Sequence, residues 1–540
     1  MSPTPFYITT AIDYPNALPH IGTAYEKIGA DAIARFYRLA GYDVFFLMGT
    51  DEHSQNVEKA AREKGVHPQA FVDEIVPQFE AAWRSLGISY DDFIRTTSQR
   101  HVRTVSDLIQ RCYDAGDIYK GTYDGYYCGS CEAFYDEADL VPTDGEYGCP
   151  THRKPVEYVK EENYFFALSK YTDRLKTHIE AHPEFIVPEG RRNEVLGLIE
   201  QGLRDFSVSR AAKEWGIPLP FDPSQVIYVW FDALTNYLSG LAPHSYENAA
   251  FDPPSDNFKK YWPADVHVIG KDISRFHCLY WPAMLMSAGL PVPKQVSIHG
   301  WVHAITLDED GRQHGWKMSK SVLAERPDLA PLIDPIAAAE RHGADALRYF
   351  LLREVPWDED GNYMLERFDQ RYNADLANDL GNLVNRVLAM INRYYGGVLP
   401  CPAQDDGPDS HLKGVAGHGV QTVWSEMKGL ELNWALSCIW TTLIKRANQY
   451  VEETAPFKLR KDPAKAERLR TVLYNLAEML RIIGLLVTPF MPATGLKIWQ
   501  QLGLGDAHAA ARLDHIKNFG GLKPGTRVEN PVPLFPKEEA

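Results

Sequence analysis

The start of the chain alternates between apolar runs and an amphipathic segment. Residues 6–12 form an apolar, strand-like run, and residues 43–48 form a second one. Between them, residues 20–39 carry apolar side chains at the spacing of an amphipathic helix. A strand, a tight loop, a helix and a second strand make the βαβ unit that opens a parallel sheet. The pattern therefore predicts an α/β fold.

The same patterns divide the rest of the chain. Residues 54–116 are predicted to be helical, with a turn at 91–93, and the sheet is predicted to resume over 226–237. A strand running into a helix is expected over 266–277, and a further strand over 296–301. Helices are expected from 337 to 504, divided by a linker at 394–414 that is rich in Gly, Pro and Asp.

Side chains able to bind a ligand follow the first two predicted strands. His20 and Gly22 lie at the start of the helix, and Asp51 directly follows the second strand. Ligands of a parallel sheet bind at the carboxyl ends of its strands. Gly22 would let a phosphate approach backbone N–H groups that the helix dipole polarises. Alone, this stretch also fits an ordinary strand-to-helix turn that carries a surface histidine.

Two cysteine-containing pairs suggest a metal site. Cys128 and Cys131 form a CxxC pair, and Cys149 and His152 form a CxxH pair. Three thiolates and one imidazole fit a tetrahedral Zn²⁺ site, and four protein ligands leave no position for water, so one structural Zn²⁺ is expected. A nucleic-acid-binding zinc ribbon is the alternative, although no cluster of basic and aromatic residues surrounds the pairs.

Composition restricts the function and the compartment. The net charge of −16 over 540 residues argues against a sequence-independent RNA binder, although a local basic groove can lie on an acidic body. The seven cysteines are an odd number, which suits a reducing compartment better than a disulfide framework. No signal peptide or membrane-spanning run is apparent. We therefore expect a cytoplasmic protein that does not enter a membrane.

A loop with two lysines far downstream favours a ligand-binding site at His20 over an ordinary strand-to-helix turn. Residues 317–321 read Lys-Met-Ser-Lys-Ser and follow Gly311 and Gly315, which suggests a flexible loop whose two lysines can reach a polyphosphate. Together with the N-terminal His-Ile-Gly turn at residues 20–22, which follows Pro15 and Pro19, this loop is highly specific. The sequence resembles the class I aminoacyl-tRNA synthetases, whose signatures are HIGH and KMSKS. Over nearly the whole chain it is most similar to the methionyl-tRNA synthetase family.

The resemblance implies an α/β fold: a Rossmann-type parallel-sheet catalytic domain with a zinc-knuckle insertion, followed by an α-helical bundle that binds the anticodon. The implied segments are the catalytic domain's first half (1–117), the connective insertion with the zinc knuckle (118–225), the catalytic domain's second half ending in the lysine loop (226–321), a stem-contact linker (322–365), the helical anticodon-binding domain (366–505) and a C-terminal tail packing back on the body (506–540). Leucine, isoleucine and valine enzymes carry a much larger editing domain in the insertion, so its shortness argues against them.

The resemblance also assigns residues to the substrates. The implied methionine-binding residues are Ile12, Tyr14, Asp51, Trp230, Ala233, Leu234, Tyr237, Ile273 and His277, with Asp51 as the ligand of the amino group. Aromatic and aliphatic walls suit an unbranched thioether. The implied ATP-binding residues are His20, Gly22, Thr23, Lys317, Ser319 and Lys320. The implied catalytic residues are His20, Lys317, Lys320 and Arg210, the last by its match to an SxSR element.

The implied reaction joins methionine to tRNA(Met). L-Methionine would attack ATP to give methionyl-adenylate and pyrophosphate, with Mg²⁺ accompanying ATP, and the 3′ end of the tRNA would then take the methionyl group. Asn382 and Arg386 lie on one helix face and match the family's anticodon-reading pair. Phe457 stands where the family usually stacks a tryptophan on a base. A monomer is expected, because the chain ends without an appended dimer-forming domain.

Two departures from the family keep alternatives open. Thr23 replaces the second histidine of HIGH, and the segment after Ser321 lacks the usual Gly-Asn turn before Asp334 and Pro335. Threonine can donate a hydrogen bond to a phosphate but carries no charge. The rivals are a class I synthetase for cysteine or another amino acid, and a non-catalytic tRNA-binding paralogue.

Overall fold

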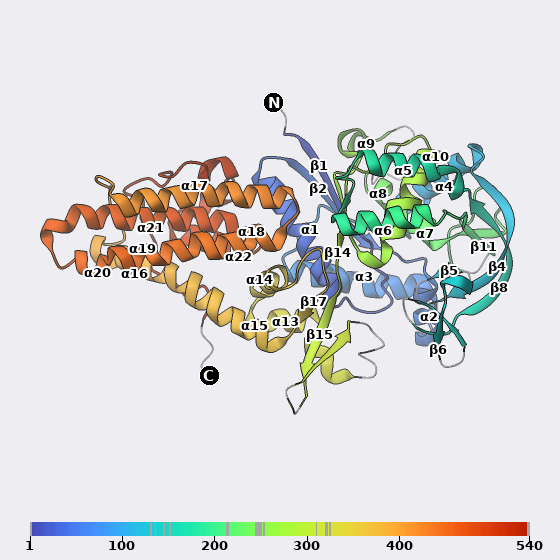
Figure 1. Cartoon of the computed structure of the whole chain (residues 1–540), viewed down its shortest axis with the longest axis horizontal. Helices are drawn as coiled ribbons and strands as arrows, with labels where there is room; N and C mark the ends of the chain where they lie inside the picture. Colours follow the sequence, from blue (N-terminus) through green and yellow to red (C-terminus); the bar gives the residue numbers. More distant parts are fainter. Residues whose placement is uncertain are drawn as a thin grey trace.

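The protein is elongated, with a helical domain at one end, a parallel sheet in the middle and an antiparallel insertion at the other end (Figure 1). The computed structural model describes residues 3–129, 132–135, 137–143, 146–150, 153–211, 215–243, 251, 254–308, 310, 312–318, 322 and 326–536. Within those ranges, no helix combines the length and the hydropathy needed to cross a bilayer.

Six parallel strands form the central sheet in the order β3-β2-β1-β13-β14-β9. Phe6 and Ile8 face one hydrophobic core, whereas Tyr7 faces a second core on the other side. This period of two explains the uninterrupted apolar runs, because both faces of the strands are buried. The strands are β1 (Pro5–Thr10), β2 (Asp43–Thr50), β3 (Asp92–Arg95), β9 (Ile186–Val187), β13 (Val266–Gly270) and β14 (Val296–His299).

Helices cover both faces of the sheet. The core on one face is covered by α1 (Ile21–Leu39), α2 (Gln55–Lys64), α3 (Pro68–Ser85) and α14 (Ala344–Glu354). The other core is covered by α4 (Gln99–Asp114), α5 (Thr172–Ala181), α6 (Glu189–Glu200), α7 (Val229–Leu234), α8 (Asn236–Ser239), α9 (Asp256–Tyr261) and α10 (Trp281–Ser287).

The expected insertion is mostly antiparallel. Its largest sheet has the order β10-β8-β4-β5, and two smaller two-stranded sheets pair β6 with β7 and β11 with β12. The strand β9 lies within the same stretch of chain but forms the edge of the parallel sheet. The strands are β4 (Ile118–Cys128), β5 (Ala133–Tyr135), β6 (Val141–Thr143), β7 (Glu146–Gly148), β8 (Glu157–Phe166), β10 (Phe206–Ser207), β11 (Ser209–Ala211) and β12 (Gln225–Ile227).

A small three-stranded sheet follows, in the order β16-β15-β17, and its β15–β16 hairpin projects from the body in Figure 1. Its strands are β15 (Val302–Leu307), β16 (Gln313–Lys317) and β17 (Gly361–Tyr363). The remaining helices are α12 (Ala330–Ile333), α13 (Pro335–His342), α15 (Leu365–Arg371), α16 (Asn382–Tyr395), α17 (Gly407–Lys428), α18 (Leu432–Cys438), α19 (Lys445–Thr454), α20 (Pro456–Leu459), α21 (Ala466–Val487), α22 (Pro492–Gln501) and α23 (Gly505–His508).

The helical domain shares one continuous core with the α1 face of the parallel sheet. The C-terminal tail contributes Leu522, Val528 and Phe535 to that core, and the Tyr372 hydroxyl donates to the Pro536 carbonyl at 2.7 Å. The tail therefore packs against the body. A linker lies where one was predicted but is shorter than 394–414, because α16 ends at Tyr395 and α17 already begins at Gly407.

Three predictions of secondary structure were wrong. Residues 361–363, inside the region expected to be helical, form β17 and pair parallel with β15. The region 54–116 is not wholly helical, because Asp92–Arg95 forms β3 and pairs with β2 at the sheet edge. The parallel sheet does not resume over 226–237, because β12 pairs antiparallel with β11 and the residues after it form α7 and α8. A four-residue strand has too little periodicity to be recognised, and a short apolar run fits a buried strand or a buried helix equally well.

Candidate active site

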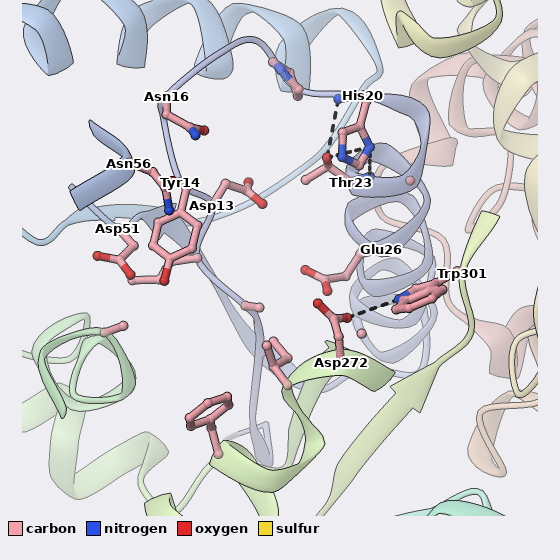
Figure 2. A pocket seen from close by; sticks show the side chains of 18 of the residues that line it. Asp13, Tyr14, Asn16, His20, Thr23, Glu26, Asp51, Asn56, Asp272 and Trp301 are labelled. Atoms are coloured by element: carbon pink, nitrogen blue, oxygen red, sulfur yellow. Dashed lines mark hydrogen bonds between the residues drawn. The ribbon is translucent and has the colours of Figure 1, made fainter. Parts of the chain in front are cut away.

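A cavity of about 560 Å³ opens at the carboxyl ends of β1, β2 and β13, against the first turn of α1. In Figure 2, Asp51, Tyr14 and Asn56 lie on one side of this cavity, and His20 and Thr23 lie on another. Every residue predicted to bind methionine lines the cavity, as do His20, Gly22 and Thr23. Segments from four separate parts of the chain are therefore brought to one edge of the sheet.

One part of the wall is aromatic and apolar. The indole of Trp230 stacks on Phe276, with ring centroids 3.7 Å apart and planes 6° apart. The Tyr237 hydroxyl lies 2.7 Å from Nε2 of His277, and Nδ1 of His277 lies 3.0 Å from the Ile273 carbonyl. A carbonyl only accepts, so Nδ1 carries the ring proton and Nε2 accepts from the tyrosine. The contact fixes both side chains at the base of the apolar wall.

A buried carboxylate faces this wall. Asp51 directly follows β2 and is only 2% exposed. Its N–H donates to the Asp13 carbonyl at 2.9 Å. Burial, together with the charges of Asp232, Glu132 and Glu52, raises the pKa of Asp51 well above its usual range. A cationic ligand beside Asp51 would offset that electrostatic penalty. The position therefore favours a ligand with an ammonium group.

Several buried polar atoms around the cavity have no hydrogen-bond partner within the described part of the chain. They include Tyr14 Oη, Asp51 Oδ1, Trp230 Nε1 and Asn236 Oδ1. Leaving such atoms unsatisfied costs about 1–3 kcal/mol each, so native proteins rarely tolerate several together without a ligand or water. Their grouping at one wall indicates a site for a molecule that is polar at one end and apolar at the other.

A histidine–aspartate cluster supports α7 from behind. Asp232 Oδ2 lies 2.8 Å from His53 Nδ1, and Asp232 Oδ1 lies 2.6 Å from His101 Nε2. Burial alone would raise the pKa of Asp232, but the charges and hydrogen bonds of the two histidines outweigh it and hold the pKa at about 2. This cluster fixes the helix that carries Trp230, Ala233 and Leu234.

The opposite wall is built from the first turns of α1. His20 is the N-cap of α1, and a Cβ added to Gly22 would lie 3.1 Å from the His20 ring. Glu26, one turn further, pairs with His299 at 3.1 Å, and Asp272 accepts from the Trp301 indole at 3.3 Å. An N-terminal helix turn with an imidazole at its cap is suited to an anionic group such as a phosphate.

A buried lysine connects the two walls. The ammonium of Lys27 donates to the Ala11 carbonyl at 2.8 Å, to Asp13 at 3.0 Å and to Glu26 at 2.6 Å. Burial alone would lower the pKa of Lys27, but the charges of Asp13 and Glu26 outweigh it and raise the pKa. Lys27 thus holds the loop after β1, which carries Ile12 and Tyr14, against the helix that carries His20.

Comparison with known proteins identifies the family. A family model described as tRNA synthetases class I (M) matches residues 6–155 and 146–388, and one described as the anticodon binding domain of methionyl tRNA ligase matches residues 418–540. The chain belongs to the methionyl-tRNA synthetase family. The prediction made from the HIGH-like turn and the KMSKS loop is confirmed, as are a Rossmann-like catalytic domain and a helical anticodon-binding domain.

Individual relatives agree over nearly the whole chain. A methionine–tRNA ligase of Caldanaerobacter subterraneus subsp. tengcongensis is 49% identical over 532 residues, which cover 98% of this chain and 78% of the relative. One from Thermotoga maritima is 44% identical, covering 99% of this chain and 80% of the relative. The solved structure of Mycobacterium tuberculosis methionyl-tRNA synthetase in complex with methionyl-adenylate is similar with a TM-score of 0.90 at 41% identity, covering 99% of this chain and 100% of that chain.

The lysine loop is only partly described. Lys317 is the last residue of β16, and Met318 lines the cavity. Ser319 and Lys320 lie outside the described residues. Met318, directly after β16, therefore reaches the cavity, and the assigned roles of the two lysines stay predictions.

Arg210 does not line the large cavity. It lies on β11, its Nε is 3.2 Å from Glu161 Oε1, and its guanidinium stacks over the Tyr127 ring at 4.3 Å. Arg210 lines a separate small pocket that it shares with Glu132 and Trp215. Its predicted contact with ATP phosphates stays a prediction, since Arg210 is not among the residues that line the large cavity.

The structure describes two of the four predicted zinc ligands. Cys128 ends β4 and Cys149 follows β7, and both residues are buried. Cys131 and His152 lie outside the described residues. The structure therefore places one cysteine of each pair in a buried position suited to a thiolate ligand, and the complete site stays a prediction.

The predicted anticodon residues lie together on the helical domain. Asn382 begins α16 and is exposed, and Arg386 follows one turn later, where it pairs with Glu452 of α19 at 2.7 Å. Phe457 in α20 is 45% exposed. The exposed ring and the two polar side chains are accessible to a single-stranded loop.

Sequence reasoning missed part of the cavity wall. Phe276, Asn236, Glu26, His299 and Asp272 line it but were not predicted. Glu26 could have been found, because a helix face that presents Thr23 also presents residues three positions on. His299 and Asp272 also end strands or follow them, which is the signal that found Asp51.

The pH dependence of stability should report on His277. Burial lowers the pKa of His277 to about 4, so the unfolded chain takes up a proton at a higher pH than the folded protein. The contribution of His277 to the free energy of unfolding is therefore complete above about pH 6.5. It is lost as the pH falls toward 4, by up to roughly 3 kcal/mol. His277→Gln should flatten urea-unfolding stability over this range. The exposed His314→Gln is the control, and an unchanged slope in His277→Gln would contradict the expectation.

Proposed function

We propose that the cavity binds L-methionine and ATP and that the chain charges tRNA(Met) with methionine in two steps. The observation that carries this proposal is the buried Asp51 carboxylate, which lines the same cavity as the aromatic wall and the N-terminus of α1. Methionine fits this arrangement, because its ammonium group would pair with Asp51 while its thioether lies among Trp230, Tyr237 and Ile273.

The first step forms an adenylate. A carboxylate oxygen of methionine attacks the α-phosphorus of ATP, the bond from that phosphorus to the bridging oxygen breaks, and pyrophosphate leaves. In the second step the terminal ribose hydroxyl of tRNA attacks the methionyl carbonyl, and AMP leaves with the electron pair. His20, with Lys317, Lys320 and Arg210 of the closed enzyme, would stabilise charge on the phosphates. Such catalysis depends on positioning and on electrostatic stabilisation.

Mg²⁺ would enter together with ATP. The acidic side chains described on the nucleotide wall are already engaged, since Glu26 pairs with Lys27 and His299, and Asp272 accepts from Trp301. The ion would neutralise phosphate charge when bound, while the protein groups orient the nucleotide. We expect the protein to contribute few direct ligands to it.

Binding of tRNA(Met) would use the opposite end of the molecule. Asn382, Arg386 and Phe457 are proposed to read the anticodon, since an exposed aromatic ring and polar side chains suit splayed bases. Arg386 would exchange Glu452 for a base or phosphate on binding. We further propose that the protein acts as a monomer in the cytoplasm.

A structural Zn²⁺ is proposed for Cys128, Cys131, Cys149 and His152. The burial of Cys128 and Cys149 supports it, because thiolates held for a metal are typically shielded from solvent. Elemental analysis of the purified protein should find about one zinc per chain. Removal of zinc by a chelator should unfold the insertion, as seen by loss of protection of β4 and β8 in hydrogen exchange. A zinc-free protein with an intact insertion would contradict the proposal.

Pyrophosphate exchange tests the function as a whole. Labelled pyrophosphate should enter ATP when methionine is present, and no other of the twenty amino acids should support comparable exchange. Exchange with a different amino acid would retain the reaction class and overturn the pocket assignment. Absence of exchange, with tRNA binding retained, would indicate a non-catalytic paralogue.

A further inference from the structure

Thr23 and His20 hold each other at the N-terminus of α1. The Thr23 N–H donates to Nδ1 of His20 at 3.2 Å, and the His20 N–H donates to Oγ1 of Thr23 at 3.4 Å. Thr23 Oγ1 also lies 3.2 Å from His20 Nδ1. This reciprocal arrangement is a capping box in which the N-cap side chain is an imidazole.

The capping box determines where the His20 ring carries its proton. A backbone N–H can only donate, so Nδ1 of His20 must present its lone pair to Thr23. The proton of the neutral ring is then on Nε2, at the edge of the ring away from Thr23. His20 lines the cavity, so its ring is held as a hydrogen-bond donor at the helix terminus where an anion would bind.

The hydroxyl of Thr23 is engaged within the box. Its oxygen accepts from the His20 N–H, and its single proton is within reach of Nδ1. Gly22 completes the arrangement, because a Cβ there would lie 3.1 Å from both Cε1 and Nδ1 of the ring. Each residue of the turn thus contributes to the orientation of one imidazole.

We propose that Thr23 is a positioning residue that acts through His20, selecting the tautomer with Nε2–H and aiming it at the phosphates, rather than an independent ATP ligand. This inference rests on the proposed function, because the group that His20 would contact is the phosphate chain of ATP. It revises the expectation from the sequence that the threonine hydroxyl contacts ATP. It also gives a role to the departure from HIGH, because the Thr23 hydroxyl, which a histidine lacks, lies within hydrogen-bond distance of both the His20 N–H and Nδ1.

A double-mutant cycle in pyrophosphate exchange tests the inference. Thr23→Val removes the hydroxyl at nearly constant volume and should lower kcat by about fivefold to tenfold, with the KM for methionine unchanged. Thr23→Ser should restore most of the rate. The double variant His20→Ala/Thr23→Val should be no slower than His20→Ala, within about twofold. Losses that multiply in the double variant would overturn the inference, because Thr23 would then contact ATP by itself.

A spectroscopic measurement separates this inference from the proposed function. In ligand-free protein labelled with ¹⁵N-histidine, the His20 signals, identified by their loss in His20→Ala, should show the Nε2–H tautomer. Thr23→Val should produce a mixture of tautomers, and Thr23→Ser should not. An Nδ1–H ring in the unmodified protein would overturn the inference even if methionine-dependent exchange is found. Conversely, absent exchange with the expected tautomer would overturn the proposed function alone.

Discussion

Replacing Asp51 by asparagine is expected to weaken methionine binding about 100-fold while leaving the KM for ATP within about twofold. The substitution keeps the shape of the side chain but removes the charge that would pair with the ammonium group. Because Asp51 is only 2% exposed, the ion pair between its carboxylate and the ammonium group would be almost fully desolvated. Losing one partner of such a pair costs about 2–5 kcal/mol, and a 100-fold loss of methionine affinity falls within this range.

Equilibrium dialysis with labelled methionine measures this effect directly, and exchange kinetics supply the KM for ATP. Asp73→Asn is the matched control, because Asp73 is half exposed and pairs with Arg95 at the surface. It should bind methionine like the unmodified protein. Equal losses for methionine and ATP would show that Asp51 supports the whole cavity and not the amino group. Unchanged methionine binding would remove Asp51 from the pocket.

Replacing Arg348 by methionine is expected to destabilise the protein by about 3–5 kcal/mol. Arg348 is fully buried, and its Nη2 lies 2.6 Å from Asp31 of α1. It also donates to the carbonyls of Pro489 at 3.0 Å and Phe490 at 2.7 Å, directly after α21. One side chain thus joins the helix that carries His20 to the helical domain.

The expected loss follows from the charge that would remain. Burial alone would raise the pKa of Asp31, but Arg348 and Arg35 outweigh it and hold the pKa at about 2. Without Arg348, the Asp31 carboxylate loses its fully buried partner and three carbonyls lose a donor. Arg35 would still pair with Asp31, but a buried carboxylate that has lost its fully buried partner is more costly than the absence of an ion pair.

Thermal and urea unfolding measure the change. Arg367→Met is the control, because Arg367 pairs with Glu354 at a half-exposed position and should contribute about 0–1 kcal/mol. The double variant Asp31→Asn/Arg348→Met removes both charges and should recover part of the loss. Equal stability of Arg348→Met and the unmodified protein would show that the surrounding structure relaxes around the lost guanidinium.

The family relationship and the cavity were both accessible to sequence reasoning, for a local reason. His20 and Asp51 directly follow predicted strands, and strand ends of a parallel sheet meet at one edge whatever the details of packing. Trp230, Tyr237 and His277 were found through motif resemblance. All of them line one cavity, although spacing along the chain does not link the first turn of α1 to residues more than two hundred positions away.

Other features depended on contacts between distant segments. The cluster of His53, Asp232 and His101 unites three parts of the chain, and none of them signals the others by local pattern. Glu132 of the insertion accepts from the N–H of Asn56 at 3.0 Å, which brings the insertion to the edge of the cavity. The strand β3 forms because β2 offers an unpaired edge, and its four residues carry too little periodicity for the strand to be predicted.

The sequence by itself determined the βαβ opening of a parallel sheet, the family and most of the predicted side chains that line the cavity, because these follow from local periodicity and short motifs. Only the tertiary structure decided the tautomer of His20, the buried connections of Lys27 and Arg348, and the separation of Arg210 from the cavity. Those features depend on hydrogen-bond geometry and charge desolvation between segments far apart in the chain, which no local pattern of residues encodes.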